Sequence, residues 1–167
     1  MMFERTGSSL LIAPRRTLLA HEHSGLLPDL GELELRPAGN MVGPELLMVD
    51  VPLWRGDAVW LDLTLRSEHP VEVAVRLDGG PENTCVVPSD PWLERCRRRD
   101  GSTTQLVAPE GGVARLDVQI RDVGESFMFT LRLIDATAPA NSLHRRPTHE
   151  PLEPIDYAQH NVAWPFD

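Results

Sequence analysis

The residues best suited to chemistry in this sequence are two histidines near the N-terminus. His21 and His23 are separated only by Glu22. On a strand, residues two positions apart project to the same face, so both imidazoles could bind one metal ion together with a carboxylate such as Asp29. A polar turn between strands would use the same residues without a metal. We expect the turn and no cofactor, and we keep a metal-dependent enzyme built on His21 and His23 as an alternative.

A dense run of arginines is the second candidate. It consists of Arg95, Arg97, Arg98 and Arg99. Guanidinium groups form forked hydrogen bonds with phosphates and carboxylates, so these side chains could contact an acidic surface on a partner protein. The alternative is a helix end, where cations interact favourably with the helix dipole and with the protein's own acids.

Two tryptophans form the third candidate. Trp54 and Trp60 share the outward parity of neighbouring strand segments. Outward aromatic side chains on a β-sandwich can stack on sugar rings, and they can also be covered by the chain's own tail or by a partner protein. We expect them to be covered, and a small-molecule or carbohydrate-binding module is the alternative.

The net charge of −9 limits the partners that the chain can bind. Such a surface repels phosphates unless a basic patch is strongly segregated, so we expect no nucleic-acid partner. No run approaches the roughly 18 apolar residues of a membrane-spanning helix, so we expect no membrane partner. The apolar residues 10–13 are too few for a signal-peptide core, which predicts a cytoplasmic location, alone or in a particle assembled there. In that compartment Cys85 and Cys96 would stay reduced.

Alternating hydrophobicity indicates the elements that must position these residues. Apolar and polar side chains alternate over residues 57–66, 71–78, 114–122 and 126–135, which places one face on a core and the other in water. Glycine-containing turns between these segments indicate hairpins. Together with weaker candidates they predict an all-β fold, an antiparallel β-sandwich of about seven to nine strands, with a barrel as the alternative.

One segment departs from this alternation. Asp90 can cap a helix, Pro91 suits a first turn and Gly101 suits a helix stop. These signals predict a short helix inserted between strands near residues 91–99.

Composition divides the chain into three parts. We predict an N-terminal arm or first short strands over residues 1–28, the sandwich core over 29–137 and an extended tail over 138–167. Repeated prolines in the last part argue against regular strand pairing there.

The tail is also rich in aromatic side chains. It contains Tyr157, Trp164 and Phe166, and aromatic residues dominate the binding energy of protein interfaces. The sequence has no nucleophile elbow and no phosphate-binding glycine loop, so an enzyme is the less favoured class. We therefore expect a non-catalytic structural or accessory subunit. It would dock into a larger assembly, made of other protein subunits or copies of itself, through these tail residues, Trp60 and the arginine run.

Overall fold

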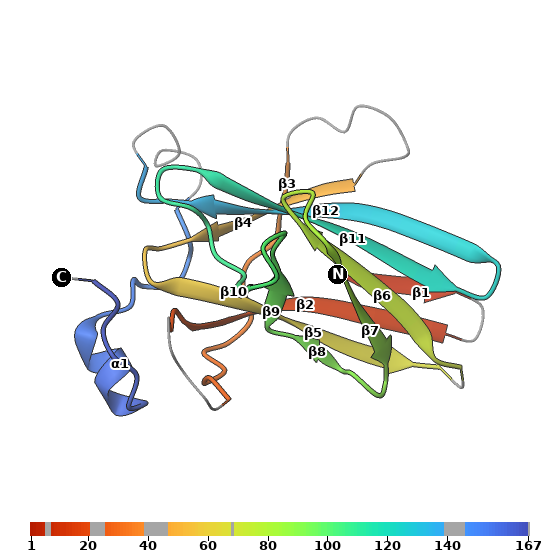
Figure 1. The fold of residues 1–167 in the computed structure, drawn as a ribbon, viewed down its shortest axis with the longest axis horizontal. Coiled ribbons are helices and arrows are strands. Elements are labelled where there is room, and N and C mark those ends of the chain that lie inside the picture. The colour runs from red at the N-terminus through yellow and green to blue at the C-terminus, as the bar shows by residue number, and fades with distance from the viewer. Residues whose placement is uncertain (6–7, 21–25, 39–46, 68, 139–145, 167) are drawn as a thin grey trace.

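A computed structural model gives the arrangement of the chain over residues 1–5, 8–20, 26–38, 47–67, 69–138 and 146–166. In this described part, two large β-sheets pack face to face (Figure 1). One has four strands in the order β1–β2–β5–β8, and the other has six in the order β3–β4–β12–β11–β6–β7. Both sheets keep edge strands, as a sandwich does and a barrel does not. The prediction of an all-β sandwich is confirmed.

The strands that the structure describes are more numerous than the seven to nine predicted, because several are only two or three residues long. They are β1 (Met2–Arg5), β2 (Ser8–Leu18), β3 (Arg36–Pro37), β4 (Leu47–Leu53), β5 (Asp57–Arg66), β6 (Val71–Leu77), β7 (Glu82–Val87), β8 (Trp92–Leu93), β9 (Arg95–Arg97), β10 (Thr103–Gln105), β11 (Val113–Asp122) and β12 (Glu125–Asp135). The segment 1–28, predicted as an arm or first short strands, contributes β1 and β2, and β2 pairs with β5 along its length.

A single cluster of buried side chains from both sheets forms the main core. The four-stranded sheet contributes Leu61 and Leu63, and the six-stranded sheet contributes Val73, Leu116 and Phe129, all almost fully buried. These are the inward residues of the alternating segments. Burial of each such side chain stabilises the fold by about 1.5–3 kcal/mol, which explains why the alternation predicted these strands correctly.

One strand pair differs from the antiparallel expectation. β12 pairs with β11 as an antiparallel hairpin, but it pairs with β4 in parallel, from Phe129 opposite Leu47 to Asp135 opposite Leu53. A parallel pair needs a long connection between its strands. Here that connection is the whole chain from β5 to β11, which local sequence patterns do not reveal.

The helix predicted near residues 91–99 is wrong. This segment forms β8, which pairs with β5, and β9, which pairs with β10. Cys96 is fully buried in the main core, and the carboxylate of Asp90 accepts a hydrogen bond from the backbone of Val86 instead of capping a helix. Strand edges and core contacts therefore outweigh the local capping signals, as tertiary context often does.

The tail contains a helix within the segment predicted to be extended. Helix α1 (Pro154–Gln159) begins with a capping box between Glu153 and Asp156, and it packs at one end of the sandwich (Figure 1). The described residues include no helix with the length and apolar character needed to cross a membrane.

Candidate functional site

The C-terminal tail closes one end of the sandwich. Tyr157 of α1 has 0% of its surface exposed and packs in a second apolar cluster with Leu18 and Leu152. Its hydroxyl donates a hydrogen bond to the carbonyl of Gly56 (2.7 Å) and accepts one from the backbone N–H of Leu19 (3.1 Å). Burial raises the pKa of Tyr157 to about 12. In this structure Tyr157 is a core residue and offers no surface to a partner.

The other two tail aromatics continue from Tyr157 in a chain of edge-to-face contacts. The ring centroids of Tyr157 and Trp164 are 4.9 Å apart, and those of Trp164 and Phe166 are 5.1 Å apart. Such geometry is favourable for aromatic pairs. Trp164 and Phe166 are half-buried, and their ring contacts hold the tail together.

A buried carboxylate fixes the segment just before α1. Asp57 has a fully buried side chain and accepts hydrogen bonds from Arg16 Nε (2.9 Å) and from the backbone N–H of Trp54 (2.9 Å). Its second oxygen lies 2.8 Å from Nε2 of His149. Arg16 and the Trp54 indole donate in turn to the carbonyls of Glu150 (2.8 Å) and His149 (2.7 Å). Trp54 is thus tied to the tail and does not face outward with Trp60.

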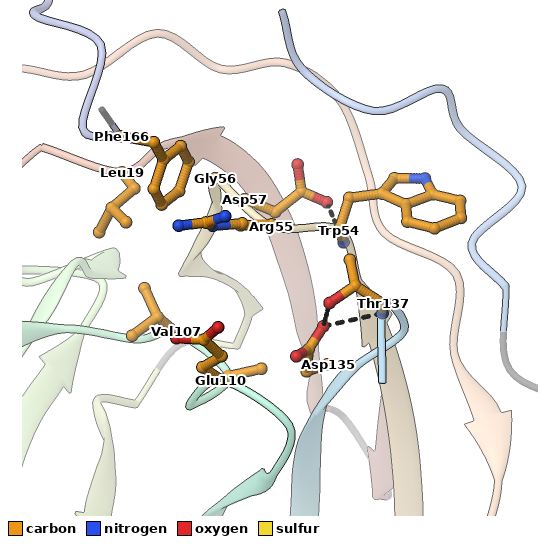
Figure 2. Close-up of a pocket in the computed structure, with 11 residues that line it drawn as sticks. Leu19, Trp54, Arg55, Gly56, Asp57, Val107, Glu110, Asp135, Thr137 and Phe166 are labelled. Carbon is orange, nitrogen blue, oxygen red and sulfur yellow. Dashed lines mark hydrogen bonds between the residues drawn. The ribbon is translucent and has the colours of Figure 1, made fainter. Parts of the chain in front are cut away.

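A pocket of about 340 Å³ lies at the same end of the sandwich (Figure 2). Its walls come from the turn between β4 and β5, the chain between β10 and β11, the end of β12 and Phe166 of the tail. Arg55 lies over the ring of Phe166, with its guanidinium carbon 4.2 Å from the ring centroid. Glu110 lies across the opening from Arg55.

Asp135 forms the floor of this pocket and is held in its charged form. Its burial opposes ionisation, but hydrogen bonds from Thr137 and from the backbone N–H of Gly111, together with the charge of Arg55, outweigh that effect and lower its pKa. The carboxylate of Asp135 therefore orders the two loops around it.

Trp60 lies on the outer face of the four-stranded sheet, and the structure brings a second tryptophan to the same face. Asp62 of β5 pairs directly with Trp92 of β8, and Trp60 pairs with Arg15 of β2. Directly paired residues share a face, and so do residues two apart on one strand. Trp60 and Trp92 are therefore diagonal neighbours, with Cα atoms roughly 7–8 Å apart. Trp92 is 51% exposed and Trp60 is half-buried.

The arginine run is spread out by the strand that replaces the predicted helix. Arg95 and Arg97 belong to β9, whereas Arg98 and Arg99 lie in the turn that follows. Arg98 donates to the hydroxyl of Thr104 (3.0 Å), and Arg99 donates to a backbone carbonyl (3.2 Å). The side chains do not form one helical patch. Arg98 bonds across its own turn, and Arg99 reaches the turn that follows β6.

Two residues of interest escaped the sequence analysis for identifiable reasons. Trp92 fell inside the mispredicted helix, so its shared face with Trp60 could not be read from strand parity. Arg55 was not identified from the sequence, because its stacking on Phe166 joins residues more than a hundred positions apart. A strand prediction for residues 92–97 would have revealed the first.

His21 and His23 lie outside the described residues, so the structure gives no geometry for a metal site there. Within the residues that are described, no three His, Cys, Asp or Glu side chains are grouped so as to hold a metal ion. Cys85 and Cys96 are both buried free thiols.

No protein-family model matches this chain, and neither the curated proteins nor the solved structures include a match.

Proposed function

We propose that this chain is a non-catalytic subunit that docks onto a partner protein through the outer face of its four-stranded sheet. We name this surface the tryptophan face and define it by Trp60 and Trp92, with Arg15 and Asp62 directly beside them. The observation that carries the proposal is the exposure of Trp92 next to Trp60 on an open sheet face. Tryptophan and arginine are enriched at the centres of protein interfaces, where charged or polar neighbours form the rim.

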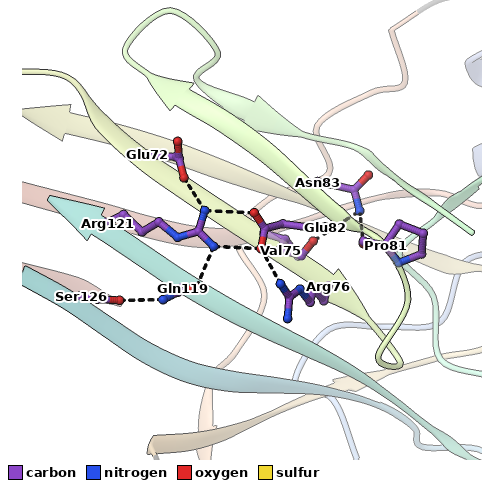
Figure 3. A network of polar contacts seen from close by, with 9 residues as sticks. All are labelled: Glu72, Val75, Arg76, Pro81, Glu82, Asn83, Gln119, Arg121 and Ser126. Atoms are coloured by element: carbon purple, nitrogen blue, oxygen red, sulfur yellow. Dashed lines mark hydrogen bonds and ion pairs between the residues drawn. The ribbon is translucent and has the colours of Figure 1, made fainter.

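The opposite face of the sandwich is less suited to docking. There Arg121 of β11 forms ion pairs with Glu72 of β6 and Glu82 of β7, and Arg76 also pairs with Glu82 (Figure 3). These charged groups already pair with one another, and burying them under a partner protein would cost desolvation energy. The tryptophan face also has an ion pair, between Arg15 and Asp29, but it differs in presenting the exposed ring of Trp92, and this difference supports it as the docking surface.

The tail is left out of this proposed surface. Tyr157 is buried, and Trp164 and Phe166 pack against it and against one another. The contacts of these three aromatic side chains hold the tail against the end of the sandwich. The proposed role of a docking subunit is unchanged, but its anchors move from the tail to the tryptophan face.

A carbohydrate-binding module is the second candidate, and one observation favours it. The Thr64 hydroxyl donates to the Asp62 carboxylate (3.2 Å) on the tryptophan face. Hydroxyl and carboxylate groups can form hydrogen bonds with sugar hydroxyls, and an exposed aromatic ring beside them can stack on the face of a sugar ring. The same side chains would serve both functions, so the experiment must separate the two ligands.

Site-specific photo-crosslinking tests the proposal. A photoreactive phenylalanine replaces Trp92 in one variant and Arg76, on the opposite face, in a control variant, both expressed in the organism that encodes the protein. We expect one discrete protein–protein crosslink from position 92, lost on adding W60A, and none from position 76. Equal crosslinking from both positions would refute the docking face. Absence of a protein crosslink, together with binding to a soluble polysaccharide in affinity electrophoresis, would establish the carbohydrate function instead.

A further inference from the structure

The pocket at the tail end of the sandwich is a separate feature from the tryptophan face. It lies at the turn between β4 and β5, beside the buried Asp57, and Phe166 of the tail forms one of its walls. A volume of about 340 Å³ is within the range of small-molecule sites. The tail therefore contributes one wall to a concave surface whose other walls are loops and strand ends of the sandwich.

The pocket contains a cation with unused hydrogen-bond donors. Within the described part of the chain, the guanidinium of Arg55 forms no hydrogen bond and no ion pair. The guanidinium stacks on Phe166, which orients its plane without using its N–H groups, and its charge acts on the carboxylate of Asp135. Figure 2 shows Arg55 extending into the pocket beneath this ring. A planar guanidinium held in this way is suited to a carboxylate, which accepts two parallel hydrogen bonds from it.

The opposite side of the pocket carries a negative charge. Glu110 is exposed, and among the described residues it has no hydrogen-bond or ion-pair partner. The neighbouring carboxylate of Asp135 differs, because its oxygens accept hydrogen bonds from Gly111 and Thr137. Glu110 is therefore the acid that remains to accept a cationic group from a ligand.

Apolar side chains line the space between these two charges. Leu19, Val107 and Phe166 contribute them. A ligand that satisfied all three features would carry a carboxylate, an ammonium group and an apolar body.

We propose that the pocket binds a small zwitterion of the amino-acid class. Its carboxylate pairs with Arg55, its ammonium group pairs with Glu110, and its apolar side chain packs against Leu19 and Val107.

Titrations followed by amide NMR test this assignment with L-phenylalanine as the probe. Two matched probes each lack one charge: phenylalanine amide has no carboxylate, and N-acetylphenylalanine has no ammonium group. We expect saturable shifts at Gly56 and Val107 with L-phenylalanine, and at least about tenfold weaker binding of either derivative, since a hydrogen bond to a charged group contributes on this order.

Three variants complete the experiment. R55M should abolish binding of L-phenylalanine, and E110Q should weaken it about tenfold by the same reasoning. R66M, an exposed arginine at the far end of β5, should leave it unchanged. The proposal is overturned if L-phenylalanine gives no saturable shifts, if N-acetylphenylalanine binds as tightly as the free amino acid, or if R55M binds like the unmodified protein.

Discussion

The carboxylate of Asp57 lies 2.8 Å from Nε2 of His149, although 92 residues of sequence separate them. Arg16 of β2 pairs with the same carboxylate, and its terminal NH2 group also donates a hydrogen bond to the carbonyl of Glu150. The contact therefore joins a strand of the core, a turn and the tail at one buried point. It explains how a proline-rich segment without strand pairing is held against the sandwich.

Replacing Asp57 by Asn should be strongly destabilising. The change removes the anion that balances Arg16, whose side chain is only 11% exposed. Loss of one partner from a buried ion pair costs about 3–5 kcal/mol in the free energy of unfolding. Urea denaturation measures this value directly.

Asp29 provides the matched control, because it also pairs with an arginine, Arg15, but its side chain is 42% exposed. D29N should change the free energy of unfolding by no more than about 1 kcal/mol. Equal effects of D57N and D29N would show that the buried contact does not hold the tail as described.

The single tyrosine of the chain gives an optical probe of tail closure. Burial raises the pKa of Tyr157 to about 12, above the ordinary value of about 10. The fold thus favours the neutral phenol, so its contribution to stability is fully present below pH 10 and is lost as the pH rises toward 12. Absorbance at the phenolate band should show an apparent pKa well above 10, and addition of denaturant should return it to the ordinary value. A native titration centred near 10 would contradict the buried position.

The two cysteines should be unreactive in the folded protein. Burial raises the pKa of Cys96 to about 12, and burial together with the charge of Asp90 raises the pKa of Cys85. The thiolate is the reactive species, so both protection from solvent and the raised pKa slow the reaction. Ellman's reagent at pH 8 should label neither thiol in native protein and both after unfolding. Rapid labelling of one thiol in the native state would exclude its buried placement.

Gly56 should tolerate a side chain poorly. Its φ is +95°, and an added Cβ would lie 3.2 Å from the Tyr157 hydroxyl and 3.3 Å from Phe166. G56A should therefore combine backbone strain with displacement of the tail. G79A is the control, since Gly79 also has a positive φ (+66°) but no atom within 4 Å of the added Cβ. We expect G79A to lower the free energy of unfolding by about 1–2 kcal/mol and G56A to lower it clearly more, as measured by thermal unfolding. A smaller effect for G56A than for G79A would argue against close packing of the tail at Gly56.

The sequence predicted the elements whose energetics are local. The alternation of residues 57–66 and 126–135 is visible because one face of each strand is buried, and β5 and β12 follow it. The turn at Gly124 between β11 and β12 was also predictable from the sequence, because the turn requires a positive φ and glycine adopts one readily.

The elements that the sequence did not predict depend on distant contacts. Helix-capping signals at Asp90, Pro91 and Gly101 flank residues 92–97, yet these residues form strands because β5 and β10 offer pairing edges. The parallel pairing of β4 with β12, and the stack of Arg55 on Phe166, likewise join distant parts of the chain. Local patterns contain no information on such contacts. The outward parity of Trp60 was visible in the sequence, but Trp92 beside it and the stack of Arg55 on Phe166 were visible only in the structure.

Native mass spectrometry of the protein purified from its own organism tests the docking function most directly. The unmodified chain, of 18.6 kDa, should appear in a complex of larger mass that contains a second protein. The double variant W60A/W92A should appear as a free monomer with an unchanged circular dichroism spectrum. A free monomer for the unmodified protein, or a complex that survives the double substitution, would contradict docking through the tryptophan face.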